Sequence, residues 1–356
     1  MNRRTLENQF LTQGSAPWKT FVLEAHDRGE PKEFLDDVFG IQALGETEDR
    51  FLHTLTAEGV EFTIDTLEDR FWSFHTTSGA ADANSYLRSA VARRRDLDFV
   101  WLPSAHLRQI QRATPPNWIK TDFRGRLILP LSEVQELSLT VRGRAAQDLL
   151  DLISGNSEFP YAVSLSQLGV DVTDSDLGAV VEAVNRLALF VAKGDSFALH
   201  QHVVQSVVRR YRGLVEAAES VAMSVDPIDS RLDQATLDGG GRPEGGPIEL
   251  RFSRPLVDLD MFLDGLFSSR EPFRLWGIVD DTVSEFAEVE AVDLHVGQRL
   301  RLEISNTMMR VHLRKGGCGN TVARLVSNLQ HHVDGGLIAT DESIQRHLDL
   351  SAVPAA

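Results

Sequence analysis

A short run of glycine and proline divides this chain of 356 residues. Residues 238–247 contain five glycines and two prolines, a composition that can hold neither a helix nor a central strand. The run predicts a flexible linker, which we extend to residues 221–247 because the preceding residues also lack a periodic pattern. A softer boundary lies near residues 154–160. The chain is therefore expected to be multidomain, of class α/β plus α+β.

The first part, residues 1–144, alternates helix and strand signals. Helices are expected at residues 18–27, 31–39, 48–57 and 80–95, and strands at residues 60–64, 70–75, 97–102 and 126–129. The clearest helical stripe is formed by Leu87, Ala90 and Val91. Strands separated by helices predict an α/β domain with a mostly internal sheet.

The middle part, residues 145–220, has the most readable pattern. A helix at 145–153 is followed by several N-cap candidates at 173–176 and by a second helix at 177–187. In that second helix, Leu177, Val180 and Val184 follow the spacing of one buried face. Gly194 and Asp195, between apolar runs at 189–191 and 197–199, indicate a hairpin. This order of parts resembles a winged helix-turn-helix, and an amphipathic helix at 203–218 follows it.

The last part, residues 248–350, predicts an α+β domain. Strands are expected at residues 248–252, 273–279, 287–294, 299–304 and 309–313, and helices at residues 256–267 and 320–333. The strand at 299–304 alternates cleanly, with Leu300, Leu302 and Ile304 on one face. Such alternation indicates an antiparallel sheet with one face covered by helices.

The charge of the chain is uneven. The net charge is -16, which argues against binding of nucleic acid by the whole surface. Residues 86–144 nevertheless contain eleven basic and five acidic side chains, a local balance of +6, with Trp101, Trp118 and Phe123 interleaved. This stretch predicts either a local basic surface or ordinary solvated arginines on helix faces.

The winged-helix interpretation predicts contact with duplex DNA, because a recognition helix fits the major groove. The candidate DNA-binding residues are Asn185, Arg186, Lys193, Arg93, Arg94 and Arg95. Residues 156–220 carry eight acids against five bases, which is unfavourable beside phosphates. A winged module that contacts a protein partner is therefore the alternative.

A glycine-rich segment at 314–321 is a candidate anion site at the start of the last helix. Its candidate residues are Arg314, Lys315, Gly317, Gly319 and Asn320. The segment lacks the Gly-Lys-Ser/Thr ending of a P-loop. The alternative is a plain glycine turn in which Asn320 or Thr321 caps the helix.

Other constellations are incomplete. His200 and His202 alternate along the chain but lack a third ligand for zinc, and His331-His332 stands alone. Neither a hydrolase set nor a magnesium nuclease set is complete; their candidates are Ser73, His75, Thr77, Asp98, Asp65 and Glu68. No catalytic residue, metal or cofactor is therefore predicted.

The expected function is that of a cytoplasmic, DNA-associated regulator in which the winged module is flanked by sensing or oligomerisation domains. An assembly factor that contacts a protein partner or a second copy of the chain is one alternative. A metal-dependent nuclease of a defence or repair system is another. The single cysteine, Cys318, suits a reducing compartment, and no apolar run is long enough to predict a membrane partner.

Overall fold

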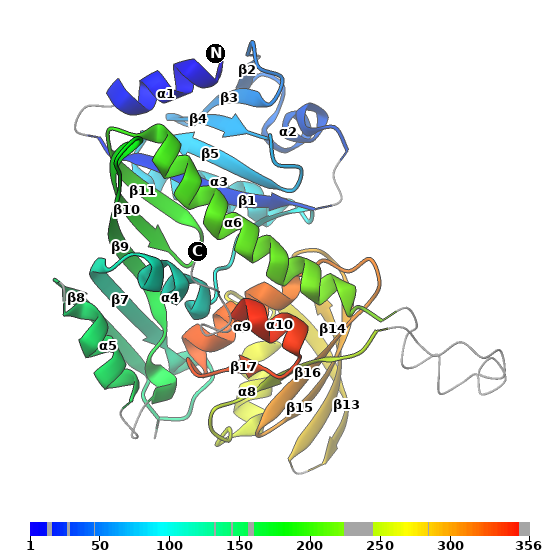
Figure 1. Ribbon diagram of the computed structural model, residues 1–356. Helices are drawn as coiled ribbons and strands as arrows, with labels where there is room; N and C mark the ends of the chain where they lie inside the picture. Colours follow the sequence, from blue (N-terminus) through cyan, green and yellow to red (C-terminus); the bar gives the residue numbers. More distant parts are fainter. Residues whose placement is uncertain are drawn as a thin grey trace.

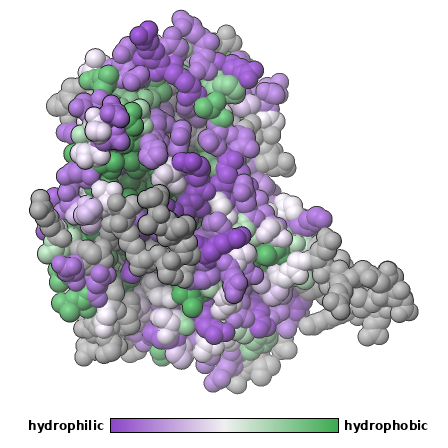
Figure 2. All heavy atoms as spheres, viewed as in Figure 1, coloured by the Kyte–Doolittle hydropathy of each residue, from purple (hydrophilic) through white to green (hydrophobic). Residues whose placement is uncertain are grey.

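The computed structural model describes residues 1–12, 16–26, 29–45, 47–131, 133–143, 145–155, 160–223, 245–283 and 285–348. These residues form two antiparallel sheets with helices around and between them (Figure 1). Most of the predicted linker, residues 224–244, lies outside the described residues. The face in Figure 2 is mostly hydrophilic, with hydrophobic side chains in scattered patches.

The large sheet extends through the first two predicted parts. Its strands are β1 (Trp18–Ala25), β2 (Leu44–Gly45), β3 (Leu52–Ala57), β4 (Val60–Asp65), β5 (Phe71–Thr76), β6 (Leu97–Phe99), β7 (Pro116–Arg124), β8 (Glu136–Arg142), β9 (Leu165–Asp174), β10 (Gly178–Asn185) and β11 (Leu189–Gly194). They follow the order β2-β3-β4-β5-β1-β11-β10-β9-β7-β8, with β6 on β1. Because β1 pairs with β11, the division predicted at residue 144 falls within a continuous sheet.

The C-terminal sheet contains the strands of the last part. They are β12 (Ile248–Arg251), β13 (Leu275–Val283), β14 (Phe286–Asp293), β15 (Arg299–Ser305), β16 (Met308–Leu313) and β17 (Ile338–Ala339). Their order is β13-β14-β15-β16-β12-β17, and neighbouring strands are antiparallel. The strands predicted in this part of the chain are confirmed. The prediction succeeds because alternating side chains show directly which face of a strand is buried.

The helices cover and connect the sheets. They are α1 (Arg3–Thr12), α2 (Pro31–Phe39), α3 (Ala80–Arg93), α4 (Ser104–Ala113), α5 (Ala146–Ser154), α6 (Phe197–Ser220), α8 (Leu259–Leu266), α9 (Asn320–His332) and α10 (Glu342–Leu348), with 3-10 turns η1 (Gly125–Leu127) and η2 (Pro160–Ala162). Helix α6 begins at the N-cap Ser196 and crosses diagonally from the large sheet towards the C-terminal sheet (Figure 1). None of the helices in the described ranges combines the length and the apolar character needed to cross a bilayer.

Helix α9 lies between the large sheet and the C-terminal sheet, which form the two halves of the protein, and every residue of the helix is buried. Its apolar face joins a core that continues from the large sheet through α6 to the C-terminal sheet. Its polar face is buried too, because it hydrogen-bonds to the first half of the chain: Ser327 donates to the carbonyl of Leu102, and Gln330 accepts from the amide of Ser104. Helices α2 and α3 cover the opposite face of the large sheet with a separate core.

The winged helix-turn-helix prediction is wrong. Residues 177–187 are mostly strand β10, and Phe197 begins the long helix α6 instead of a hairpin strand. In β10, Val180, Glu182 and Val184 all point inward. A glutamate at an inward position hides the alternation of a strand, so the spacing of the remaining apolar residues resembles that of a helix.

The α/β prediction for the first part is also corrected. Neighbouring strands of the large sheet are antiparallel, so its class is α+β. Residues 18–25, for which a helix is predicted, form strand β1. This strand is buried along its whole length and so lacks the alternation of a strand with one exposed face. Residues 52–57 form strand β3 in place of the helix predicted at 48–57, and residues 125–127 form a 3-10 turn where a strand is predicted at 126–129. Helices α2, α3 and α5 and strands β4 and β5 are confirmed.

Candidate functional site

A cleft of about 700 Å³ lies where the large sheet meets the C-terminal part. We call it the junction cleft. It is lined by Arg88, Trp101, Asp122, Arg124, Arg126, Gln135, Glu136, Ser166, Gln167, Asn185, Arg186, Leu187, Glu271, Pro272, His331 and His332. Its walls thus come from α3, β7, η1, the β10–β11 turn and the end of α9, and its volume is in the range of small-molecule sites.

Arg186 is held in place by the turn between β10 and β11. The side chain of Asn185 shapes this turn, because its Oδ1 accepts from the amides of Leu187 at 2.9 Å and Leu189 at 3.1 Å. The Arg186 guanidinium donates to Asn328 Oδ1 at 3.0 Å and lies 5.4 Å from the ring centroid of Trp101. No carboxylate pairs with it among the described residues, so its charge is left for the cleft.

The other charges of the cleft are only partly neutralised. Arg124 pairs with Asp122 at 3.3 Å, and Arg126 pairs with Glu136 at 3.4 Å. Arg88 stacks over Phe99 at 5.6 Å, again without a carboxylate partner in the described ranges. Burial, followed by the charge of Arg88, lowers the pKa of Arg186 to about 10, so the guanidinium stays charged at neutral pH. With Glu271, the lining holds four arginines and three carboxylates, so the cleft keeps a net positive charge of one that attracts anions.

Two buried imidazoles form the part of the cleft wall that α9 supplies. The rings of His331 and His332 are nearly perpendicular, with centroids 4.7 Å apart. His332 Nδ1 donates to the carbonyl of Arg124 at 2.8 Å, whereas His332 Nε2 and His331 Nδ1 have no partner among the described atoms. Burial, and next the charge of Arg186, lower the pKa of His331; burial likewise lowers that of His332 to about 4. Both rings are therefore neutral at pH 7 and present free nitrogens.

The residues predicted to bind DNA do not form one surface. Asn185 and Arg186 line the junction cleft, but Lys193 is exposed near the far end of β11, roughly 20 Å away by strand geometry. Arg93, Arg94 and Arg95 follow α3 elsewhere. Arg94 is engaged by Asp37 and Asp96, while Arg95 packs near Gly297.

The predicted anion site at 314–321 has its amide donors occupied from within the protein. The amide of Gly319 donates to Glu219 Oε1 at 2.9 Å, and that of Cys318 donates to Gln298 Oε1 at 2.7 Å. Asn320 is buried and hydrogen-bonds to Tyr211 and Asp98. The other three candidates, Arg314, Lys315 and Gly317, belong to the adjoining turn. Within the protein, Glu219 therefore takes the position that an anion would occupy at Gly319.

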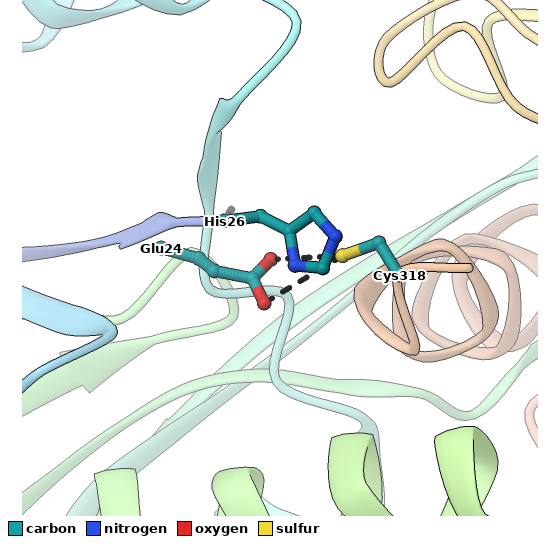
Figure 3. A group of neighbouring side chains, drawn as sticks. All are labelled: Glu24, His26 and Cys318. Carbon is teal, nitrogen blue, oxygen red and sulfur yellow. Dashed lines mark hydrogen bonds between the residues drawn. The ribbon is translucent and has the colours of Figure 1, made fainter. Parts of the chain in front are cut away.

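Beside this segment, Glu24, His26 and Cys318 converge with their ligand atoms within 4.8 Å of one another (Figure 3). The set has the chemistry of zinc ligands. However, the guanidinium of Arg70 donates to Glu24 Oε1 at 2.6 Å and lies 3.6 Å from Cys318 Sγ. Burial raises the pKa of Glu24 to about 7 and that of the Cys318 thiol well above its usual value. A fixed cation and protonated ligands both oppose metal binding, so we propose no metal here.

The catalytic sets considered from sequence are not assembled. Asp98 accepts from Trp101 Nε1 at 3.1 Å and from Arg324 Nη1 at 3.2 Å, which makes it part of a buried contact between the two halves. His75 hydrogen-bonds to Thr20, away from Asp98. Asp65 pairs with Arg3, and Glu68 with Arg212.

Comparison with known proteins places the chain in a family. The fold and the site define a protein of two antiparallel sheets with a cationic cleft where they meet. The model of the MJECL33-like protein family matches residues 2–346 of the chain. The chain belongs to this family. It is 25% identical over 361 residues to the protein MJECL33 of Methanocaldococcus jannaschii, covering 90% of this chain and 85% of that protein. No solved structure matches. Neither name states an activity, so function is argued from geometry.

Proposed function

We propose that the protein binds a small phosphate-bearing ligand in the junction cleft. The observation that carries the proposal is the Arg186 guanidinium, which lines the cleft beside Arg88 with no carboxylate partner in the described part of the chain. Guanidinium groups bind phosphate oxygens through two parallel hydrogen bonds. The neutral His332 donates through Nδ1 to the carbonyl of Arg124, so its Nε2 is an acceptor and suits a hydroxyl or N–H of the group attached to the phosphate, not the phosphate itself.

The size and lining of the cleft favour a phosphate ester over a free anion. A volume of about 700 Å³ leaves room for an attached group of nucleoside size. Ser166, Gln167 and Gln135 line the cleft with neutral hydrogen-bonding groups that suit a hydroxylated or heterocyclic group. A cytoplasmic location, where such esters are abundant, is part of the proposal.

Duplex DNA is the competing ligand. The arginine that favours it most, Arg186, lines a recess at the junction, and Lys193 lies at the other end of β11. A duplex needs several phosphate contacts along one surface. The arrangement therefore favours a small ligand, and DNA binding is tested in the same experiment.

Replacing Arg186 with methionine is expected to weaken phosphate binding by about 10- to 100-fold, the effect of losing a hydrogen bond to a charged group. Binding of inorganic phosphate, pyrophosphate and adenosine 5′-monophosphate would be measured by calorimetry and by the fluorescence of Trp101, which contacts Arg186. Lys193→Met is the matched control, since it removes an exposed cation outside the cleft and should leave the affinity unchanged.

Three results would contradict the proposal. The first is a wild-type protein that binds none of the three probes. The second is equal loss of affinity in the Arg186 and Lys193 variants. The third is salt-dependent retention on duplex DNA that Lys193→Met abolishes and that adenosine 5′-monophosphate does not compete. Arg88→Met repeats the test if Arg186→Met lowers the unfolding midpoint.

A further inference from the structure

A second feature, independent of the junction cleft, is a chain of four buried polar side chains inside the large sheet. Glu182 Oε2 lies 2.9 Å from His200 Nδ1, and His200 Nε2 lies 2.8 Å from Thr20 Oγ1. Thr20 Oγ1 in turn lies 2.9 Å from His75 Nδ1. We call these four residues the buried relay. All four are at most 1% exposed, so water does not compete for these hydrogen bonds.

Strand register brings the relay together from distant parts of the chain. Thr20 of β1 lies directly opposite His75 of β5, and His75 lies opposite Thr63 of β4. Directly paired residues share a face of the sheet, so these side chains form a row on the side covered by α6. His200, in the first turn of α6, reaches down to this row and meets Glu182 of β10.

The order of donors and acceptors in the relay follows from the carboxylate at its end. Glu182 Oε2 accepts from His200 Nδ1, and with a single proton on the His200 ring its Nε2 is an acceptor. Thr20 has one proton to donate, gives it to His200 Nε2, and therefore accepts from His75 Nδ1. In a neutral imidazole only one nitrogen is protonated. The Nε2 of His75 is therefore left as a bare lone pair.

His75 also lines a second cleft of about 560 Å³ between α1 and the sheet. The cleft is lined by His75, Trp18, Thr54, Thr63, Thr76 and Glu61, among others. Neither His75 Nε2 nor Trp18 Nε1 has a partner among the described atoms, although both are buried. A bare acceptor and a free N–H donor, on rings 5.8 Å apart, are complementary to one hydroxyl group.

We propose that His75 is a general base that takes a proton from a hydroxyl group of a small neutral ligand bound in this second cleft. The O–H bond breaks, its electron pair stays on oxygen, and a new N–H bond forms at His75 Nε2. The Nδ1 proton of His75 moves to Thr20, whose own proton moves to His200 Nε2. The product is an imidazolium at His200 beside the Glu182 carboxylate, while Trp18 Nε1 donates to the oxygen that has lost its proton.

The surroundings of His75 keep its ring neutral. Burial lowers its pKa to about 3; Asp65 acts in the opposite direction, and His200 and Arg3 act with burial. Asp65 is itself paired with Arg3, at 2.6 Å. His75 is therefore neutral before the transfer, and the relay moves the added charge to His200, beside the carboxylate of Glu182.

The test reads the tautomer of His75 directly. In the full-length protein at pH 7, nitrogen-15 NMR of the imidazole rings is expected to show His75 with Nδ1 protonated and Nε2 bare, the signal being assigned with His75→Gln. Thr20→Val should shift the ring towards the Nε2–H tautomer, because it removes the hydrogen bond that holds the proton on Nδ1, a bond that weights the equilibrium by about tenfold.

Two control variants separate the relay from a structural role. Thr20→Ser keeps the hydroxyl and should restore the tautomer. Thr121→Val removes a buried hydroxyl of the same sheet, in β7 and outside the second cleft, and should leave the tautomer unchanged. The proposal is overturned by a protonated Nε2 in the wild-type protein, or by a Thr20→Val variant that loses stability while the tautomer stays unchanged.

Discussion

Lowering the pH from 7 to 5 is expected to reduce the free energy of unfolding by roughly 5 kcal/mol, because four buried histidines must be charged in the unfolded chain but not in the folded one. Burial is the main cause of the lowered pKa of each, to about 3 for His75 and His106, to about 4 for His332, and strongly downward for His331. Below pH 6.5 the unfolded state therefore binds more protons, and each histidine costs about 1.4 kcal/mol per pH unit.

One group acts in the opposite direction. The pKa of Glu24 is raised to about 7 by burial, so its protonated form favours the folded state as the pH falls from 7 towards 4.5. This gain offsets about one of the four histidines. Burial also lowers the pKa of His53, His295, His312 and His347, so the net uptake on unfolding is at least about three protons. The loss of stability is therefore expected to begin near pH 6.5 and to steepen towards pH 5.

Urea unfolding at half-unit intervals of pH measures this slope. His106→Gln should reduce it by about one proton, because His106 is fully buried with only its Nε2 hydrogen-bonded, to the carbonyl of His347. His202→Gln, at an exposed position of α6, should leave the slope unchanged. A stability that is flat between pH 7 and pH 5 would refute the assignment of neutral buried rings.

Replacing Arg324 with methionine is expected to destabilise the protein by about 3–5 kcal/mol, the cost of leaving buried carboxylates without their cation. Arg324 of α9 lies 3.2 Å from Asp98 and 2.5 Å from Asp293, so it joins the large sheet to the C-terminal sheet. Burial alone would raise the pKa of Asp293, but the charge and hydrogen bond of Arg324, together with hydrogen bonds from Thr321 and the amide of His295, lower it. Without Arg324, the carboxylates of Asp98 and Asp293 would remain buried away from water with no cation beside them.

Arg310→Met is the matched control. Arg310 also contacts two carboxylates, Glu249 at 3.1 Å and Glu303 at 3.4 Å, but its side chain is 39% exposed. Solvent-exposed pairs contribute less than about 1 kcal/mol. Urea midpoints at pH 7 compare the two variants, and equal losses would show that the buried contact does not join the halves. Asp293→Asn combined with Arg324→Met should recover part of the loss, since one unpaired charge is removed.

Sequence patterns predict the fold well where one face of an element meets solvent. Strands β13 to β16 have this geometry, and their alternation is visible in the sequence. The pattern fails where an element is buried on both faces, as in β1, or where a polar residue points inward, as Glu182 does in β10. The polar residues of α9 look like a solvated face, yet they are buried against the first half of the chain.

The junction cleft could be predicted only in part. The basic stretch at 86–144 contains three of the arginines of the cleft, Arg88, Arg124 and Arg126. The fourth, Arg186, is a predicted binding residue because of its charge. Their convergence with His331 and His332 depends on contacts between residues far apart in the chain, which no local spacing encodes. The His331-His332 pair was a visible signal, but without the cleft beside it, the pair could not be distinguished from two solvated rings.

The buried polar face of α9 also restricts how such a protein can evolve. An apolar interface tolerates many different side chains opposite it. Hydrogen bonds such as those of Ser327 and Gln330 instead require a particular acceptor or donor opposite them. Neither half could be exchanged by recombination without stranding these groups away from water. The two halves are thus expected to be inherited as one piece, in keeping with a family match that is continuous from residue 2 to residue 346.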